Sequence, residues 1–239
     1  MKDLDIGIIG LGVMGQNLAL NIKTRGETHP NTGTTLHDLG LVAASRGDYA
    51  SAHALFRRAM ATLQKALGDN HPLVATTHNS VAHAWILQGK YDQAAAELQS
   101  ALEIARPALG PEHQLVAIYT INLGSVQLAR KQPAAAEALL REGLRIRLLS
   151  PRVVPSRRRT FPEDDWSVGA TKSLLGAALM AQARYGEAEA LLLEARRDLE
   201  ALPAPPRRDI QTTINRLIEL YDAWRKPESA SAYRALLAS

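Results

Sequence analysis

A spacing of 42 residues is the feature that most constrains how this chain can fold. His29, His71 and His113 follow one another at this interval. A second set of positions keeps the step and then lengthens it once to 52 residues, which places a ten-residue insertion in the third repeat: Gly47, Gly89, Lys131 and Ala183. Because a period of this size containing two helical patterns is typical of stacked helical hairpins, the spacing predicts an all-α solenoid.

The second repeat shows what each hairpin contains. His71-Pro72 opens it, with proline at the first helical position, where an N–H would have no helical partner. Gly89 ends the first helix, because glycine adopts the left-handed conformation without strain. Apolar and small residues recur at helical spacing on one face of each predicted helix: Val74, Thr77, Val81 and Trp85, then Ala94, Leu98, Ala101, Leu102 and Ala105. We expect the second helix to stop near Pro107 and Gly110.

Small residues occupy two register positions of the second helices. One set predicts close contact between the two helices of a hairpin, and it consists of Ala52, Ala94, Ala136 and Ala188. The other set is expected to face the next hairpin, and it consists of Ala59, Ala101, Gly143 and Ala195. A single hairpin cannot bury both of its faces, so we expect stability to come from stacking.

The repeat assigns most of the chain to one elongated array. We predict a right-handed superhelical solenoid of antiparallel helical hairpins over residues 27–239, preceded by a separate segment over residues 1–26. The expected repeats cover about residues 29–70, 71–112, 113–164 with the insertion, 165–206 and a short last one at 207–239. Aromatic residues make up only 5% of the chain, which suits thin layers of helices better than a thick globular core.

Three motifs carry a family resemblance. They are Leu-Gly-x-x-His-Pro at residues 67–72, Gln-Gly-Lys-Tyr-x-x-Ala at 88–94 and Ala-Leu-x-Ile at 101–104. Together they resemble the tetratricopeptide repeat in the 42-residue form of kinesin light chains. Residues 173–193 and 221–238 are similar to repeats at the C-terminal end of some bacterial serine/threonine kinases, although no kinase motif is present. Local departures lie in the third hairpin, at Lys131, Pro133 and Gly143.

The first 22 residues carry a different pattern. A short apolar stretch precedes Gly10, Gly12 and Gly15, which have the G-x-G-x-x-G spacing of a dinucleotide-binding turn. The sequence that begins at Gly10 resembles the start of 6-phosphogluconate dehydrogenase, an NADP-dependent enzyme. Such a turn needs a second parallel strand further on, but His29-Pro30 begins a predicted helix there. We therefore interpret the glycines as non-functional and expect no cofactor, with an NADP-binding dehydrogenase fragment as the alternative.

This segment also matches the register of the array. Gly26 lies 42 residues before Gly68, so residues 16–24 fall where a preceding second helix would be. Our hypothesis is that a dehydrogenase start has been joined to the array, naturally or by construction. Its helix would then cap the first hairpin through three apolar side chains, Leu18, Leu20 and Ile22.

The titratable residues form no catalytic or metal-binding pattern. The chain has no cysteine, and His78 and His83 are five residues apart rather than the four that place two ligands on one helix face. The three periodic histidines precede helix starts, which indicates a structural role. Neither a Gly-x-Ser-x-Gly turn nor another placed nucleophile occurs. We predict a protein that is not an enzyme and holds no metal.

An arginine cluster supports a second alternative, a basic-patch nucleic-acid binder. Its members lie on the third hairpin and in its insertion: Arg141, Arg145, Arg147, Arg152, Arg157, Arg158 and Arg159. No aromatic residues interleave with them for base stacking, and Glu163, Asp164 and Asp165 oppose their charge. We interpret the cluster as a solvated surface and do not expect nucleic acid as a partner.

The chain also lacks the signals of membrane insertion and export. No run reaches the roughly 20 apolar residues that span a bilayer. Asp3 and Asp5, rather than basic residues, precede the apolar stretch 6–20, so we expect no signal peptide and a cytoplasmic location.

Polar residues at repeating positions of the first helices are the candidate partner contacts. Three register positions supply them: Thr35, Thr77, Tyr119 and Thr171; then His37, Asn79, Ser173 and Asn215; then Asp38, Ser80 and Asn122. The asparagines are scattered, so the paired-asparagine carboxylate clamp of some family members is not carried over. The resemblance implies a non-catalytic module that holds an unidentified peptide or protein in the concave groove of the solenoid.

Overall fold

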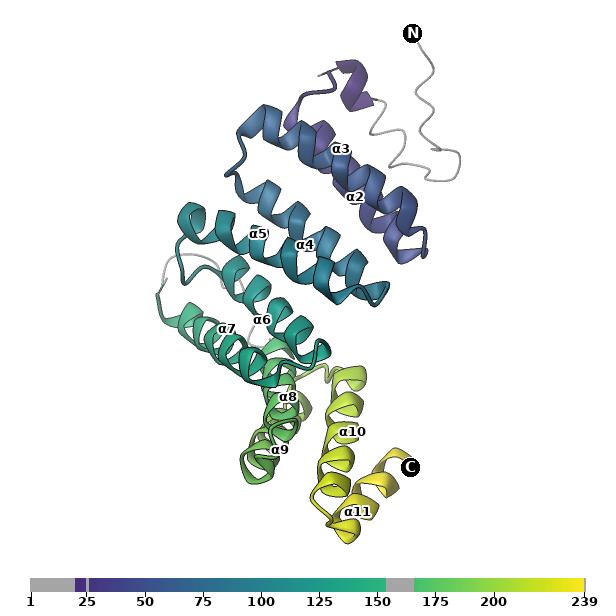
Figure 1. Cartoon of the computed structure of the whole chain (residues 1–239), viewed down its shortest axis with the longest axis vertical. Coiled ribbons are helices and arrows are strands. Elements are labelled where there is room, and N and C mark those ends of the chain that lie inside the picture. The colour runs from purple at the N-terminus through teal and green to yellow at the C-terminus, as the bar shows by residue number, and fades with distance from the viewer. Residues whose placement is uncertain (1–19, 25, 154–165, 239) are drawn as a thin grey trace. The chain divides into compact units, whose positions relative to one another are not determined.

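The computed structural model describes residues 20–24, 26–153 and 166–238, which fold into helices without a strand among them. Figure 1 shows helices α2 to α11, which pair into hairpins through short turns. The chain divides into two compact units, unit 1 (Met1–Pro111) and unit 2 (Glu112–Ser239). The expected all-α, hairpin-based fold is confirmed.

Unit 1 contains two hairpins. The first pairs α2 (Pro30–Ser45) with α3 (Tyr49–Leu67), and the second pairs α4 (Pro72–Leu87) with α5 (Tyr91–Leu109). Helix α5 continues through Pro107 and ends at Leu109, because Gly110 takes a φ of 91° that a helix cannot continue.

The periodic histidines cap the first helices. The ring Nδ1 of His29 accepts a hydrogen bond from the N–H of Asn31 at 3.1 Å. His71 and His113 accept in the same way from Leu73 and Leu115, at 3.2 and 3.1 Å. Each ring therefore satisfies one of the N–H groups that lack a partner in a first turn. This explains in physical terms why histidine returns every 42 residues.

A left-handed residue closes the turn inside every hairpin. Gly47 and Gly89 have φ values of 79° and 70°. The same register position keeps this conformation in unit 2 without glycine, at φ values of 58° to 59°, in Lys131, Ala183 and Arg225. The tight turn is thus preserved where the sequence departs from the glycine pattern.

The core of unit 1 joins its two hairpins. Leu36, Leu39 and Phe56 are almost fully buried, and they belong to a cluster that includes Val81 of α4. Residues 20–24 are helical, and Ile22 packs against this cluster. Leu20, by contrast, is 57% exposed and is not among the side chains packed against this cluster. Leu18 lies outside the described residues.

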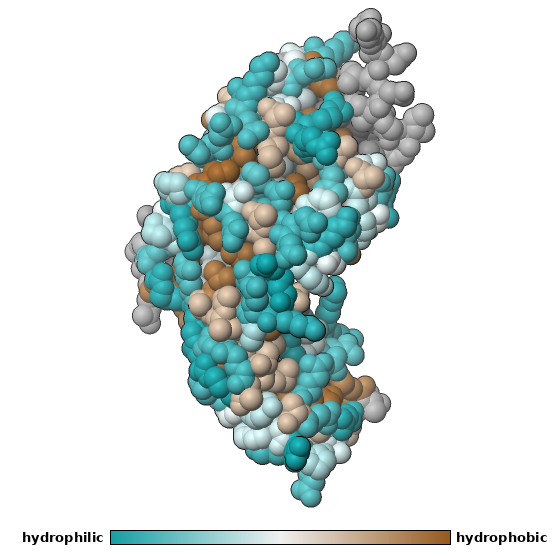
Figure 2. All heavy atoms as spheres, in the orientation of Figure 1, coloured by the Kyte–Doolittle hydropathy of each residue, from teal (hydrophilic) through white to brown (hydrophobic). Residues whose placement is uncertain are grey.

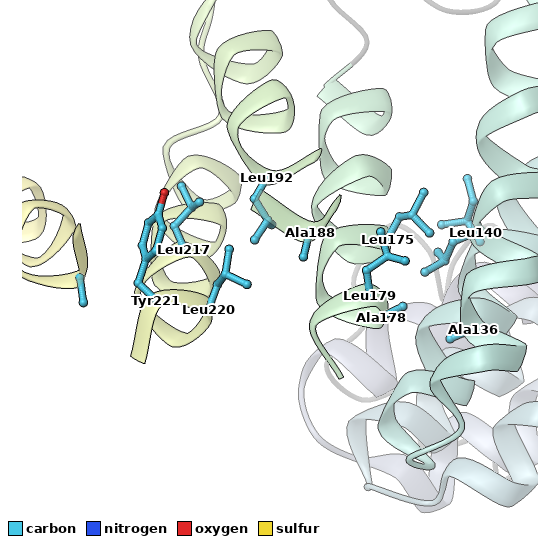
Figure 3. Close-up of a cluster of buried hydrophobic side chains, with 12 residues drawn as sticks. Ala136, Leu140, Leu175, Ala178, Leu179, Ala188, Leu192, Leu217, Leu220 and Tyr221 are labelled. Atoms are coloured by element: carbon cyan, nitrogen blue, oxygen red, sulfur yellow. The ribbon is translucent and has the colours of Figure 1, made fainter. Parts of the chain in front are cut away.

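Unit 2 contains three hairpins. They are α6 (Gln114–Ala129) with α7 (Pro133–Val153), α8 (Trp166–Met180) with α9 (Tyr185–Glu200), and α10 (Arg207–Ala223) with α11 (Pro227–Ala238). Figure 3 shows side chains of neighbouring helices pointing toward one another, among them Leu140, Leu175, Leu192 and Leu217. One continuous apolar cluster therefore runs through the stacked hairpins of this unit.

Glycines on the first helices let leucine and phenylalanine side chains of the second helices pack closely. A Cβ added to Gly40 would meet Phe56 at 2.6 Å, and one added to Gly176 would meet Leu192 at 2.7 Å. A Cβ on Gly143 would meet Ile121 of α6 at 2.4 Å. This register position therefore faces its own hairpin rather than the next one, which corrects the expectation for Gly143.

Candidate functional site

Three predicted contact residues, His37, Ser80 and Ser173, form hydrogen bonds between neighbouring first helices. In unit 1, His37 Nε2 of α2 lies 2.8 Å from Ser80 Oγ of α4. In unit 2, Arg216 Nη1 of α10 donates to Ser173 Oγ of α8 at 2.7 Å. The two pairs occupy the same two register positions, 43 residues apart. The repeat thus makes the same polar bridge once in each unit.

The unit 1 bridge has the connectivity of a proton relay. His37 Nδ1 also lies 3.2 Å from Asp38 Oδ1, so serine, imidazole and carboxylate follow one another. Acyl transfer also needs N–H donors aimed at the developing oxyanion. Ser80 is 7% exposed in the middle of α4, where backbone N–H groups are used by the helix itself. The arrangement therefore positions His37 rather than activating Ser80.

The first register position is buried, which corrects part of the predicted contact set. Thr77, Tyr119 and Thr171 are at most 2% exposed, and Ser173 of the second register position is 1% exposed. Thr35 is half-buried and accepts a hydrogen bond from Asn21 Nδ2 at 3.0 Å. Thr77, Tyr119, Thr171 and Ser173 are thus withdrawn from the surface, whereas Thr35 keeps partial exposure.

The remaining predicted residues reach the surface to different degrees. The side chain of Asp38 is 56% exposed, and Asn215 is exposed. Asn79 and Asn122 are half-buried. These four residues, together with the half-buried Thr35 and His37, are the part of the predicted set that stays accessible on the first helices.

Apolar residues on the same helices were missed by the sequence analysis. Leu41 of α2 and Leu87 of α4 are 40% and 48% exposed. His83 is exposed one helical turn before Leu87 and one turn after Asn79. The repeat register offered a signal for these residues, because Leu41 shares its register position with His83, and Leu87 shares its position with Ser45. We define the unit 1 face by five residues: Asp38, Leu41, Asn79, His83 and Leu87.

In unit 2 the first helices also carry a half-buried cation, Arg216. We define the unit 2 face by Asn122, Asn215 and Arg216. Burial lowers the pKa of Arg216, and the charges of Glu219 and Asp209 oppose that shift. Within the described residues its guanidinium makes no ion pair and donates to Ser173 alone, so donors remain for an oxygen acceptor.

The arginine cluster is partly neutralised. Arg141 pairs with Glu137 at 2.8 Å, and Arg145 pairs with Glu112 at 3.0 Å. Arg147 is 8% exposed and donates to Ser167. The side chains of Arg152, Arg157, Arg158 and Arg159, with Glu163, Asp164 and Asp165, lie outside the described residues. A basic surface is therefore not formed by the three arginines whose side chains are described.

Gly10, Gly12 and Gly15 lie outside the described residues, and α2 begins where a second strand of a nucleotide-binding fold would be needed. In the described part of the chain, no three His, Asp or Glu side chains gather as metal ligands would.

Of the described helices, none combines the length and apolarity needed to cross a bilayer. Figure 2 shows hydrophilic residues over most of the visible surface, with hydrophobic residues in small groups between them.

Two family models match the chain. One tetratricopeptide repeat model matches residues 73–148, and another matches residues 32–73. The chain carries tetratricopeptide repeats. The match covers the first three hairpins up to α7, including the turns at Gly47, Gly89 and Lys131. Curated proteins give no match.

Solved structures extend the tetratricopeptide likeness over most of the chain. A Podosopora anserina protein with nearly identical TPR-like repeats, described as a kinesin light chain, has a TM-score of 0.68 at 21% identity, covering 87% of this chain and 96% of its own. BtubC (BKLC) from P. vanneervenii has a TM-score of 0.72 at 19% identity, covering 95% and 93%. Pseudomonas aeruginosa PilF has a TM-score of 0.60 at 17% identity, covering 97% and 86%. At these identities the likeness establishes the solenoid fold.

Proposed function

We propose that this tetratricopeptide protein is a non-catalytic interaction module that holds an extended peptide segment of a partner protein against its first helices. Tetratricopeptide repeats are in general protein-interaction modules, and the matched models cover residues 32–148 without a break. The observation that carries the proposal is the mixture of exposed polar and apolar side chains on the first helices, with Asn79, His83 and Leu87 on successive turns of α4.

The chemistry of the two faces suggests complementary features of the peptide. On the unit 1 face, Leu41 and Leu87 would lose water on contact with an apolar side chain, and Asn79 can bond to a peptide backbone. On the unit 2 face, Arg216 has donors for a carboxylate or a backbone carbonyl. Each face is proposed as a binding surface on its own.

The test is a selection from a displayed library of random peptides on the immobilised full chain, followed by affinity measurements. We expect enriched peptides to lose at least about tenfold in affinity with Asn79→Ala or Leu87→Ala in unit 1, or with Asn215→Ala in unit 2. Circular dichroism should remain unchanged, because these side chains are exposed or half-buried.

Matched controls lie on the second helices. Arg58→Ala and Lys65→Ala change exposed cations of α3, and Arg197→Ala changes one of α9. Their affinities should stay within about twofold of the unsubstituted chain. Loss of binding in these controls with retention in the first-helix variants would overturn the proposal, as would a selection that enriches no peptide.

A further inference from the structure

A partly buried polar contact joins the two hairpins of unit 1. His53 of α3 stacks on Trp85 of α4, with ring centroids 3.8 Å apart. Its Nε2 lies 2.9 Å from Gln88 Nε2, at the C-terminal cap of α4. The three side chains therefore form part of the seam along which the second hairpin packs on the first, and we call them the unit 1 seam.

The geometry of Gln88 favours a neutral His53 ring. Gln88 Nε2 also lies 2.9 Å from the carbonyl oxygen of Ala84, which can only accept. The atom between the two partners must then be the amide nitrogen, which donates one hydrogen to each. His53 Nε2 is consequently the acceptor in this arrangement, a role that a neutral ring with its proton on Nδ1 can fill.

The same junction occurs in unit 2 with different chemistry. Gln182 holds the register position of Gln88 and donates to the Ala178 carbonyl at 3.2 Å and to Glu137 Oε2 at 2.8 Å. Glu137 occupies the position of His53, and Arg184, in the position of Lys90, pairs with it at 2.7 Å. Burial raises the pKa of Glu137 but is outweighed by bonds from Gln182, Arg141 and Arg184, so the net shift is downward. At this position the carboxylate of Glu137 is balanced by neighbouring arginines, whereas an imidazolium would be repelled by them.

The charges that face His53 also disfavour its protonated form. Burial lowers the pKa of His53, and the positive charges of Lys90 at the start of α5 and Arg57 on α3 lower it further. Glu97 of α5 opposes this, while also pairing with His78 Nδ1 at 2.6 Å. Lys90 Nζ lies 4.8 Å from the centroid of the Trp85 ring, beside which His53 also packs. A protonated His53 would therefore bring a second positive charge to the same ring, and the two cations would repel each other.

We propose that the unit 1 seam is an acid-sensitive latch, in which protonation of His53 at Nε2 releases Gln88 and loosens the packing of the second hairpin on the first. The proton comes from solvent, and the imidazolium then carries N–H groups on both nitrogens, so the Gln88 amide faces a donor. Unit 2 has no such latch at Glu137, because its carboxylate accepts the same bond throughout neutral and mildly acidic pH.

The direction of the pH effect follows from linkage. The pKa of His53 is lower in the folded chain than its ordinary value of about 6.5 in an unfolded one. At a pH between these two pKa values, His53 binds a proton in the unfolded chain but not in the folded chain. The stabilisation of the seam is therefore complete above about pH 6.5 and is lost as the pH falls through that window.

The first experiment is an NMR titration of the histidine rings in the full chain. His53 should titrate below the ordinary histidine value, and Gln88→Glu should raise its pKa by about one unit or more, since a carboxylate favours the imidazolium. His53 titrating at or above the ordinary value in the unsubstituted chain would overturn the proposal.

The second experiment measures opening of the seam by hydrogen exchange of α3 and α4 amides between pH 7.5 and pH 5, after correction for intrinsic rates. Exchange should rise on acidification in the unsubstituted chain, by about tenfold for each unit by which the His53 pKa is lowered. His53→Glu, which copies unit 2, should abolish the rise. The matched control His83→Gln, an exposed histidine on α4, should keep it. An equal rise in the His53→Glu chain would contradict the latch.

Discussion

At the scale of single residues, the turn inside each hairpin keeps the same backbone conformation although the residue type changes. Lys131, Ala183 and Arg225 adopt the left-handed backbone that Gly47 and Gly89 take in unit 1. For a residue with a Cβ this conformation costs roughly 1–2 kcal/mol. The departures from glycine noted in the sequence therefore leave the turns intact, and their cost is borne by the packing of the flanking helices.

Ala183→Gly should stabilise unit 2. Relief of left-handed strain exceeds the greater entropy that glycine gives the unfolded chain, for a net gain of about 0.5–1 kcal/mol. Thermal and chemical unfolding followed by circular dichroism measure it. The control Ala190→Gly, at an exposed position inside α9, should instead destabilise by about 1 kcal/mol. A lower stability for Ala183→Gly would show that the turn carries no strain.

At the scale of elements, the two helices of a hairpin are matched in side-chain size, with a glycine on one facing a large side chain on the other. Gly40 lies against Phe56, Gly124 against Leu140 and Gly176 against Leu192, each within one hairpin. The close backbone approach needs both a missing Cβ on the first helix and a large side chain on the second. This pairing accounts for the tight packing of hairpins that contain few aromatic residues.

Gly176→Ala should destabilise unit 2 by about 0.5–2 kcal/mol. The new Cβ would lie 2.7 Å from Leu192 Cγ, and the resulting overpacking exceeds the gain in helix propensity. Gly186→Ala is the matched control, because nothing lies within 4 Å of its added Cβ, and it should be neutral or slightly stabilising. Equal effects of the two substitutions on the unfolding free energy would refute the size-matching account.

The helix of residues 20–24 provides a second prediction at this scale. We propose that it caps the first hairpin, because Ile22 packs against the unit 1 core and Asn21 bonds to Thr35. Ile22→Asp should lower the stability of unit 1 by about 1–2 kcal/mol, since a carboxylate would replace an apolar contact. Leu20→Asp, at a 57% exposed position, should leave the melting temperature unchanged. Similar melting of both variants would exclude a capping role.

At the scale of the whole molecule, stability is organised as in other solenoids. The described hairpins of unit 2 share one apolar cluster, yet each hairpin contacts only its neighbours. Stability in such a stack is a sum of local and nearest-neighbour contributions. The last hairpin, α10 and α11, packs on the α8–α9 hairpin.

Leu217→Ala should therefore act locally. This fully buried leucine of α10 contributes to the cluster shared with α8 and α9, and its truncation should cost about 2–4 kcal/mol. Hydrogen exchange should show α10 and α11 losing protection while α6 and α7 keep theirs. A uniform loss of protection from α6 to α11 would mean that unit 2 unfolds as one cooperative body rather than hairpin by hairpin.

The sequence by itself determined the helical hairpins, because their signals are local. Helix starts at His29, His71 and His113, the left-handed turns, and the alternation of small and large apolar residues all follow from backbone geometry within a few residues. The same locality gave the first-helix registers, and Asp38 and Asn215 lie exposed on those helices.

Only the tertiary structure decided which way each register position faces. Thr77 and Tyr119 are as regular in sequence as Asn79, yet they are buried whereas Asn79 is half-buried. Gly143 turned out to face its own hairpin, and His53 meets Gln88 across 35 residues of sequence. A helical period fixes the angle between positions on one helix, whereas the rotation of that helix against its neighbours depends on contacts between residues far apart in the chain.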